Sequence, residues 1–226
     1  MILIHIERLS KTYGRGRLAV NALHGLNLDI KKGALWAVMG PSGCGKTTLL
    51  NILGGLDRPT TGRVILDGVD LFTLSESALY NIRRHKTGFV FQSYHLLPNL
   101  NAQENVLVPA IPRPGEARRL RARARELLAL VGLSGKEKNR PGQLSGGEQQ
   151  RVAVARALIM DPPVILADEP TGNLDRPNGQ KIVALLQKLN RETGKTILIT
   201  THDPAVAAHC QRTITLDNGH LAGRGL

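Results

Sequence analysis

Residues 40–47 read Gly40-Pro41-Ser42-Gly43-Cys44-Gly45-Lys46-Thr47, and this stretch decides the fold class of the chain. Its spacing, G-x-x-x-x-G-K-[ST], is that of a phosphate-binding loop. Residues 34–39, directly before it, are nearly all apolar and predict a buried strand, while residues 47–53 have helical periodicity. A strand, a glycine-rich loop and a helix in this order form the context that the motif requires.

The residue types of this loop suit the phosphates of a nucleotide. Small residues let successive backbone N–H groups face a phosphate, and the N-terminus of the following helix adds a partial positive charge. Lys46 can reach the β- and γ-phosphates, and the hydroxyl group of Thr47 can bind Mg²⁺. We assign the next residue, Thr48, to the same site. Cys44 is expected to contribute only its backbone.

A second motif delivers two carboxylates to the end of an apolar strand, residues 164–169 with the sequence VILADE. In a doubly wound sheet, ligands bind at the carboxyl ends of the strands. Asp168 is therefore placed to hold Mg²⁺, and Glu169 to polarise an attacking water as a general base. Pro170 predicts an extended backbone at Glu169. Alone, the two carboxylates are equally well interpreted as caps of the next turn, but the phosphate loop upstream favours the functional interpretation.

A third motif opens the helix predicted over 147–159. It reads Leu144-Ser145-Gly146-Gly147-Glu148. Ser145 and Glu148, three residues apart, form the pattern of a capping box, which would only stabilise the helix. The two glycines also make a helix start that could hold phosphate. Two such helix starts in one small chain suggest that one copy binds phosphate and another copy closes over it.

The alternation of strands and helices predicts an α/β fold, a P-loop NTPase core with a mostly parallel sheet. Residues 2–9 alternate like an edge strand, and an antiparallel β subdomain is expected at the N-terminal end. Prolines separate short predicted helices between about 93 and 158, and we expect this region to form a helical subdomain inserted into the α/β core. The whole chain, 1–226, is expected to form a single domain. Further helices are predicted over 75–84, 116–131, 179–193 and 204–210, and further strands over 27–30, 63–66, 88–91, 196–200 and 213–216.

The composition narrows the classes of partner. The 226 residues carry a formal net charge of +12, which suggests an anionic partner, but only 3% are aromatic, too few for a single-stranded nucleic-acid platform. We expect no specific nucleic acid, and we interpret the arginine-rich stretch 113–125 as a solvated helix face. Cys44 and Cys210 form no disulfide framework or zinc motif. We expect neither a secretory leader nor a membrane span, because no apolar run is long enough.

These motifs together resemble the ATP-binding-cassette (ABC) ATPases, over essentially the whole chain. LSGGE at 144–148 is the signature of that family, and residues 40–47 and 164–169 match its Walker A and Walker B motifs. The resemblance assigns Gln92 to the Q-loop, Asp175 to the D-loop, His202 to the H-loop, and Tyr13 to the aromatic loop that stacks on adenine.

The resemblance implies an ATP sandwich between two copies packed head to tail. ATP and Mg²⁺ would lie between the phosphate loop of one copy and the signature of the other. Gln92 would join Thr47 and Asp168 around Mg²⁺ and sense a transmembrane partner. His202 would contact the γ-phosphate, so that Glu169, His202 and Lys46 are the catalytic residues. Asp175 would lie across the seam between the copies. The implied cofactor-binding set is Tyr13, Gly40, Pro41, Ser42, Gly43, Cys44, Gly45, Lys46, Thr47, Thr48, Gln92, Ser145, Gly146, Gly147, Glu148 and Asp175.

Residues 89–106 and 171–175 are similar to the lipoprotein-release, macrolide-export and cell-division group of these ATPases. This similarity implies an integral-membrane permease that docks near Gln92 and the helical subdomain. It also implies a cytoplasmic location on the inner face of the membrane, and export or extraction of a lipoprotein or hydrophobic compound. Segment 109–116, short and proline-rich, departs from the group pattern.

Three alternative functions are left open. One is a cell-division ATPase that regulates wall hydrolases through a membrane partner. Another is a soluble ABC ATPase of DNA repair or translation, disfavoured because the chain has one cassette and no zinc or coiled-coil insertion. The third is a nucleotide-gated scaffold with little turnover, disfavoured because Glu169 and His202 are both present.

Overall fold

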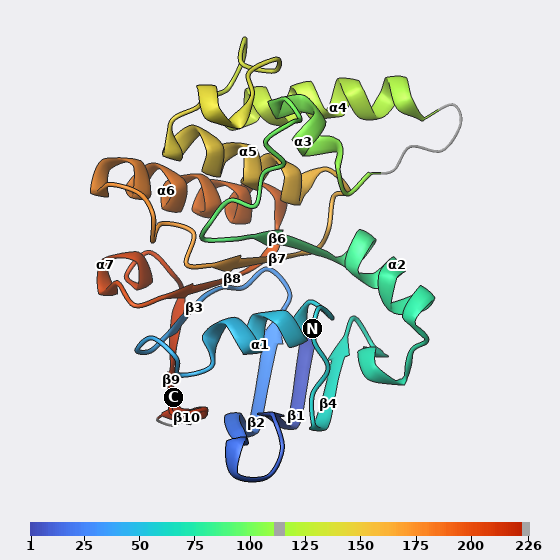
Figure 1. The fold of residues 1–226 in the computed structure, drawn as a ribbon, viewed down its shortest axis with the longest axis vertical. Coiled ribbons are helices and arrows are strands. Elements are labelled where there is room, and N and C mark those ends of the chain that lie inside the picture. Colours follow the sequence, from blue (N-terminus) through green and yellow to red (C-terminus); the bar gives the residue numbers. More distant parts are fainter. Residues whose placement is uncertain (111–115, 223–226) are drawn as a thin grey trace.

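The computed structural model describes residues 1–110 and 116–222 and has an α/β architecture in layers. A central sheet has helices α5 (Gly146–Leu158) and α6 (Arg176–Thr193) on one face (Figure 1). Helix α1 (Lys46–Leu53) and a second sheet lie on the other face. The predicted fold class is confirmed.

The central sheet has six strands in the order β10-β9-β3-β8-β7-β6. Neighbouring strands from β9 to β6 pair in parallel, and only β10 runs antiparallel to its neighbour. A mostly parallel sheet is thus confirmed. The strands are β3 (Leu35–Met39), β6 (Thr87–Val90), β7 (Val164–Asp168), β8 (Thr196–Thr201), β9 (Arg212–Asp217) and β10 (His220–Ala222).

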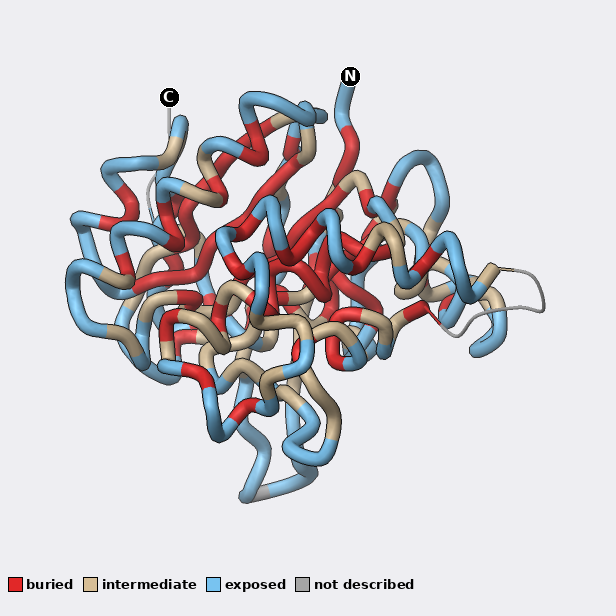
Figure 2. Tube along the Cα trace, turned by 90° about the horizontal axis from the view of Figure 1, so that it is seen from above, coloured by how far each residue is buried: buried red, intermediate tan, exposed pale blue. Residues whose placement is uncertain are grey.

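The apolar runs form central strands because both faces of this sheet are covered. In β7, Ile165 and Ala167 join the core cluster that contains residues of α5 and α6. Val164 and Leu166 join the cluster on the other face, with residues of α1. Successive side chains of a strand point to opposite faces, so a strand covered twice needs apolar residues throughout. The buried segments gather in the interior in Figure 2.

The N-terminal sheet has four antiparallel strands in the order β2-β1-β4-β5, as predicted. The prediction that residues 2–9 form an edge strand is wrong, because β1 lies between β2 and β4 and pairs with both. The alternating pattern reflects one half-exposed face rather than a free edge. The strands are β1 (Ile2–Tyr13), β2 (Val20–Lys31), β4 (Thr61–Leu66) and β5 (Val69–Asp70).

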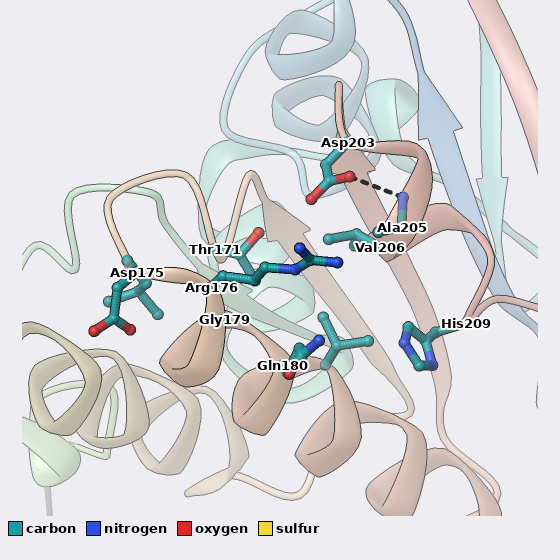
Figure 3. Close-up of a pocket in the computed structure, with 11 residues that line it drawn as sticks. Thr171, Asp175, Arg176, Gly179, Gln180, Asp203, Ala205, Val206 and His209 are labelled. Carbon is teal, nitrogen blue, oxygen red and sulfur yellow. Dashed lines mark hydrogen bonds between the residues drawn. The ribbon is translucent and has the colours of Figure 1, made fainter.

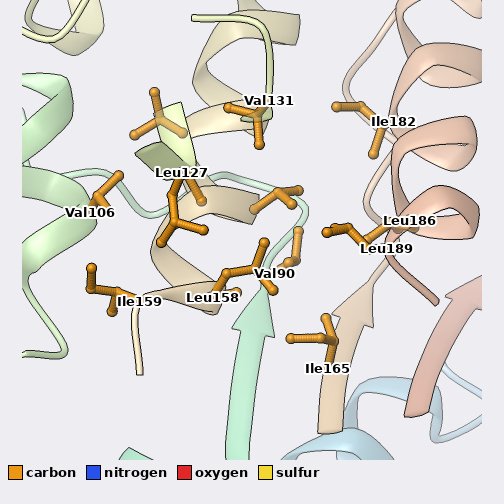
Figure 4. Close-up of a cluster of buried hydrophobic side chains, with 14 of the residues drawn as sticks. Val90, Val106, Leu127, Val131, Leu158, Ile159, Ile165, Ile182, Leu186 and Leu189 are labelled. Carbon is orange, nitrogen blue, oxygen red and sulfur yellow. The ribbon is translucent and has the colours of Figure 1, made fainter. Parts of the chain in front are cut away.

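A group of helices packs over the far side of α5. Helix α4 (Ala117–Leu130) places Leu120, Ala124, Leu127 and Leu128 in the core and carries arginines on its outer surface. Figure 4 shows Leu127 among side chains from α5, α6 and the central sheet.

The remaining helices are α2 (Glu76–Lys86), α3 (Ala102–Leu107), α4 (Ala117–Leu130) and α7 (Pro204–Ala207), and the 3₁₀ turns are η1 (Gly16–Leu18), η2 (Leu71–Thr73) and η3 (Pro141–Gln143).

Helices α3, α4 and α5 pack against one another, and α5 also packs on β6 of the central sheet. The boundaries 93–158 of a helical subdomain stay a prediction. Part of the proline-rich segment 109–116, and Arg113 with it, lies outside the described residues. Among the described helices, none combines the length and apolar character that crossing a bilayer requires.

Candidate active site

The candidate residues meet at one edge of the central sheet. The phosphate loop follows β3, Asp168 ends β7, and His202 follows β8. Because these strands are parallel, their carboxyl ends share an edge. A cavity of about 430 Å³ opens there and is lined by Ala22, Ser42, Gly43, Gly45, Lys46, Thr47, Thr48, Gln92, Glu169 and His202. Nine of these ten residues were predicted from the sequence, and Ala22 was not.

Glycine is required at the end of the phosphate loop. Gly45 precedes α1 with a φ of 105°, in the left-handed region that side chains disfavour. A Cβ atom there would lie 2.4 Å from the carbonyl oxygen of Ala22. Cys44 is buried beside it with a free thiol, and its side chain is not among those lining the cavity. Cys44 therefore contributes no side chain to the cavity, and Gly45 can offer only its backbone.

Lys46 is 5% exposed, and its ammonium group is held by the loop to which it belongs. Its Nζ donates to the carbonyl oxygens of Gly40 at 2.8 Å and Pro41 at 2.9 Å. Glu169 Oε1 lies 3.4 Å from the same atom. A buried ammonium group needs such polar partners. These contacts aim the positive charge at the cavity floor, where a phosphate anion would meet it.

Asp168 is held by two hydroxyl groups. Its Oδ1 accepts from Thr47 Oγ1 at 3.1 Å and from Thr200 Oγ1 at 2.6 Å. Thr200, fully buried in β8, also uses Oγ1 to accept the N–H of Glu169 at 3.0 Å. This one threonine therefore orients both carboxylate residues. This role of Thr200 was not predicted from the sequence, although a threonine directly after the apolar run of residues 197–199 was the available signal.

The backbone of Glu169 differs from the prediction. Its φ is 42°, in the left-handed region, so the extended conformation expected before Pro170 is wrong. Two sets of hydrogen bonds hold it there. The Glu169 N–H donates to the Thr200 backbone carbonyl at 3.2 Å, and the Glu169 carbonyl accepts from the Gly172 N–H at 3.0 Å, which closes a turn. Strain of this kind persists only where the surroundings fix the residue, and it concentrates at functional sites.

The Glu169 carboxylate points into the cavity between two cationic or polar groups. Its Oε2 lies 3.1 Å from His202 Nδ1, while its Oε1 faces Lys46. The Glu169 side chain is 16% exposed and that of His202 is 61% exposed. A carboxylate that is held from both sides and opens to solvent can accept a proton from a water in the cavity.

The signature lies outside this cavity. Ser145 caps α5, since its Oγ accepts from the Glu148 N–H at 3.4 Å and its own N–H donates to Glu148 Oε2 at 2.8 Å. Lys136 forms an ion pair with Glu148. The hydrogen bond from Lys136, followed by that from the Ser145 N–H, lowers the pKa of Glu148 to about 2. The capping box is therefore present, and none of residues 144–148 lines the cavity of the same chain.

Comparison with known proteins connects this arrangement to a family. A sequence model described as "ABC transporter" matches residues 23–172, which include the phosphate loop, the signature and both strand-end carboxylates. The chain belongs to the ABC transporter family.

Relatives of this ABC protein cover nearly its full length. It is 47% identical over 218 residues to the lipoprotein-releasing system ATP-binding protein LolD of Bordetella pertussis, covering 96% of this chain and 94% of the relative. It is 48% identical over 219 residues to the macrolide export ATP-binding/permease protein MacB of Brucella melitensis, where 97% of this chain matches 34% of a longer protein. The suspected group within the family is confirmed.

A solved relative matches the fold of this ABC protein. The dimeric structure of the ATP-binding cassette MJ0796, a protein of Methanocaldococcus jannaschii, in a post-hydrolysis state with ADP and Pi, superposes with a TM-score of 0.89. The two sequences are 45% identical, and the match covers 99% of this chain and 100% of that chain. This ABC protein is an ATPase of the transporter type, as predicted.

Gln92 of this ABC ATPase lines the cavity and is hydrogen-bonded to the segment after the two strand-end carboxylates. Its Nε2 donates to Asn173 Oδ1 at 3.3 Å, and Asn173 Nδ2 donates back to the Gln92 carbonyl at 3.2 Å. A Cβ atom on Gly172 would lie 2.8 Å from Gln92 Nε2, so glycine lets the two segments approach. A change in the position of Gln92 would therefore be transmitted to residues 172–173.

Tyr13 does not line the cavity of the ABC ATPase. Its hydroxyl donates to Asp57 Oδ2 at 2.6 Å and lies 3.5 Å from Thr48 Oγ1, and Lys11 Nζ lies 4.6 Å from the ring centroid. Burial, and then the bond to Asp57, raises the pKa of Tyr13. One face of the ring is covered by Lys11. Its stacking on adenine stays a prediction.

Asp175 also lies outside the cavity. It caps α6, where its Oδ1 accepts from the Asn178 N–H at 2.9 Å. It lines a separate surface hollow of about 340 Å³ between α6 and α7, into which Arg176 extends toward Asp203 (Figure 3). The single chain thus gathers the phosphate loop, the carboxylates, Gln92 and His202, and leaves Tyr13, Asp175 and the signature apart.

Proposed function

We propose that two copies of this ABC ATPase close head to tail on ATP, and that closure drives a membrane permease. The permease would extract or export a lipoprotein or a hydrophobic compound. The observation that carries the dimer is the separation within one chain: the phosphate loop lines the cavity, and the signature does not. A second copy supplies the missing lid. The dimeric structure of MJ0796 with ADP and Pi has the same fold and supports this arrangement.

In this proposal the loop amides and Lys46 bind the phosphates of ATP and neutralise the charge that develops during transfer to water. The carbonyl oxygens of Gly40 and Pro41 keep Lys46 extended along the loop. ATP lies with its γ-phosphate near Glu169, where the ammonium group exchanges its contact with the carboxylate for one with phosphate. Glu169 is then free to orient the attacking water.

The Mg²⁺ site is proposed from the chemistry of the donors. Mg²⁺ prefers oxygen ligands and commonly uses one or two protein groups together with phosphates and water. The hydroxyl of Thr47 and the carboxylate of Asp168 lie 3.1 Å apart, and the amide of Gln92 lines the same cavity. These oxygen donors match the coordination that Mg²⁺ prefers. When bound, the ion would offset phosphate charge, while Thr200 keeps Asp168 in place through its 2.6 Å hydrogen bond.

Glu169 and His202 are proposed to act together on the water and the γ-phosphate. Glu169 Oε2 accepts the proton of the attacking water as general base. His202, whose Nδ1 lies 3.1 Å from that oxygen, holds the carboxylate in position and can contact the γ-phosphate with its other ring nitrogen. Its 61% exposed side chain leaves room for this contact.

The permease is proposed to dock in an apolar groove bordered by α2, β6, α5 and the residues that follow α3. The groove, of about 340 Å³, is lined by Leu56, Phe89, Val108 and Met160 among others, and two of these are half exposed, Leu56 at 49% and Val108 at 42%. A permease helix with apolar anchors would fit it. Arg156 lies in the same groove and donates to the carbonyl oxygens of Tyr94 and His95, two and three residues beyond Gln92. Docking there would be transmitted to the cavity, and it would hold the ATPase on the inner, cytoplasmic face of the membrane.

The variant Glu169→Gln tests this function. Removing the base should lower kcat by about 10²- to 10⁴-fold, while ATP binding and closure remain. Size-exclusion chromatography should then give a dimer with Mg-ATP and a monomer without nucleotide. Wild-type protein, run with the same nucleotide, is the control. A variant that stays monomeric with ATP, or that keeps full turnover, would contradict the proposal.

The cargo and permease need a separate test. The ATPase carrying Glu169→Gln, with ATP added, should capture an integral-membrane permease from detergent-solubilised membranes of its source. The substitution Val108→Glu, in the groove, should abolish capture without changing ATP-dependent dimerisation. Undiminished capture by Val108→Glu would exclude the groove as the docking site.

A further inference from the structure

The turn between β9 and β10 lies against the phosphate loop. Asn218 and Gly219 form this turn with φ values of 44° and 76°, both in the left-handed region. Figure 1 shows β9 and β10 beside β2, at the end of the sheet where α1 begins. None of the motifs in the sequence involves this hairpin, and the ATPase mechanism above does not use it.

Gly219 connects the phosphate loop to β2 through its two backbone groups. Its N–H donates to the carbonyl oxygen of Cys44 at 3.1 Å, and its carbonyl accepts from the N–H of His24 at 2.9 Å. The hairpin is thus hydrogen-bonded to the phosphate loop on one side and to the N-terminal sheet on the other. These segments are far apart in the sequence and meet only in the fold.

The bond to Cys44 fixes the direction of the next amide. The peptide that joins Cys44 to Gly45 is planar and trans, so its carbonyl and its N–H point to opposite sides. The carbonyl points at Gly219. The N–H of Gly45 therefore points away from the hairpin, on the side where Gly45 lines the cavity. Backbone N–H groups of this loop are the proposed phosphate donors.

Close backbone packing holds the two groups of the Gly219–Cys44 hydrogen bond in position. A Cβ atom on Gly219 would lie 2.7 Å from the Ala22 carbonyl oxygen, and one on Gly45 would lie 2.4 Å from the same oxygen. On the other side, a Cβ atom on Gly40 would lie 2.1 Å from the carbonyl oxygen of Leu216 in β9. The loop is held between β2 and the hairpin at van der Waals distance.

Two histidine side chains hold the hairpin against β2. The rings of His24 and His220 stack with centroids 4.4 Å apart and planes 5° from parallel. His24 is in β2 and His220 opens β10, directly after Gly219. Stacked rings favour one relative position of the two strands, and that position sets the Gly219 N–H over the Cys44 carbonyl.

We infer that Gly219 is a positioning residue of the ATPase, which aims the Gly45 amide at the phosphates of ATP, and that the His24–His220 stack holds it in place. The inference rests on the proposed role of residues 40–47 in phosphate binding. An amide that contacts phosphate equally before and during transfer contributes to binding rather than to turnover. Loosening the hairpin therefore raises KM for ATP and leaves kcat unchanged.

The variant His220→Ala tests the inference, because it removes an exposed side chain and the stack but no backbone group. We expect KM for ATP to rise about three- to tenfold, the effect of one weakened hydrogen bond, with kcat within about twofold of wild type. His220→Phe restores a flat ring and should return KM to the wild-type range. His85→Ala, an exposed histidine on α2, is the matched control and should leave KM unchanged.

Gly219→Ala addresses the positioning residue directly and should raise KM further than His220→Ala. If this variant does not fold, His220→Ala and His220→Phe still decide the question. An unchanged KM in His220→Ala, a loss confined to kcat, or no recovery in His220→Phe would overturn the inference. Wild-type ATPase activity in the same assay would leave the proposed function intact in each of those cases.

Discussion

The two ends of the proposed ATP site differ in how complete they are within one chain. At the phosphate loop, Lys46 already contacts Glu169, and Thr200 already holds Asp168. At the start of α5, Ser145 and Glu148 satisfy each other and face no cavity residue. The first end is preorganised by parallel strands that end at one edge, while the second is a capped helix that meets ATP only in the proposed dimer. In the proposed dimer, one chain therefore binds the nucleotide by itself and still requires a second chain for turnover.

The largest effect is expected from the incomplete end. Ser145→Arg places a bulky cation at the start of α5 and should block closure, because no second chain can then approach the phosphate held by the first. Turnover should fall about 100-fold or more, the range of one lost oxyanion-type contact. Nucleotide affinity of the monomer, measured by titration of a fluorescent ATP analogue, should stay within about twofold of wild type.

The control for Ser145→Arg is Ser77→Arg, which places the same cation at an exposed serine in the first turn of α2, outside the cavity and the signature. It should keep ATP-dependent dimerisation in size-exclusion chromatography. If Ser145→Arg weakened nucleotide binding by the monomer as strongly as it weakened turnover, the two ends would not be independent, and the comparison would be wrong.

The phosphate-loop end of the site can be weakened through Thr200, a buried residue that holds Asp168 and Glu169. Thr200→Val keeps the shape of the side chain but removes the hydroxyl that donates to Asp168 and accepts from Glu169. We expect a fall in kcat of about tenfold and a loss of about 1 to 2 kcal/mol in the free energy of unfolding, because buried polar groups lose their partner. Steady-state kinetics and urea unfolding measure the two effects.

Thr193→Val, at the end of α6, is the matched control for Thr200→Val. Its hydroxyl donates to the Leu189 carbonyl, far from the cavity. It should change unfolding slightly and kcat not at all. An unchanged kcat in Thr200→Val would mean that Asp168 and Glu169 hold their positions without the threonine.

The smallest effect is expected at the cap of α5. Glu148→Gln keeps the capping geometry but removes the charge that pairs with Lys136. The pKa of Glu148 is lowered to about 2 from an ordinary value of 4.5, so its stabilising effect is full above the ordinary value and disappears as pH falls toward the lowered one. The free energy of unfolding of Glu148→Gln should therefore be about 1 kcal/mol below that of wild type near neutral pH, and the difference should be smaller in acid.

Urea unfolding of wild type and Glu148→Gln at about pH 7 and about pH 3 measures this difference. The gap between the two proteins should be larger at the higher pH. A gap that widens in acid would contradict the assigned direction of the pKa shift.

Local sequence pattern predicted the parts of the fold that depend on local chemistry. The phosphate loop, the apolar strand before it and the capped start of α5 were all found from residues that are neighbours in the chain. The helix predicted over 116–131 matches α4 closely, because its apolar stripe is long and regular. Helix α3 was not predicted as such, since six residues show little periodicity.

The errors arose where distant residues decide the structure. The edge-strand prediction for β1 failed because β4, more than fifty residues later, pairs along its second side. The extended conformation predicted for Glu169 failed because Thr200, on another strand, fixes its backbone. The hydroxyl of Tyr13 donates to Asp57, a residue that belongs to none of the sequence motifs. Contacts between residues far apart in the sequence leave no local trace in it, and all three contacts are of that kind.

The crystal structure of the Glu169→Gln variant with Mg-ATP would test the central claim most directly. Two copies should be found with each ATP buried between them, and residues 145–147 of one copy should lie at hydrogen-bond distance from the γ-phosphate held by the phosphate loop of the other. If residues 145–147 faced solvent while ATP occupied the cavity of a saturated protein, the claim that a second chain completes the site would be contradicted.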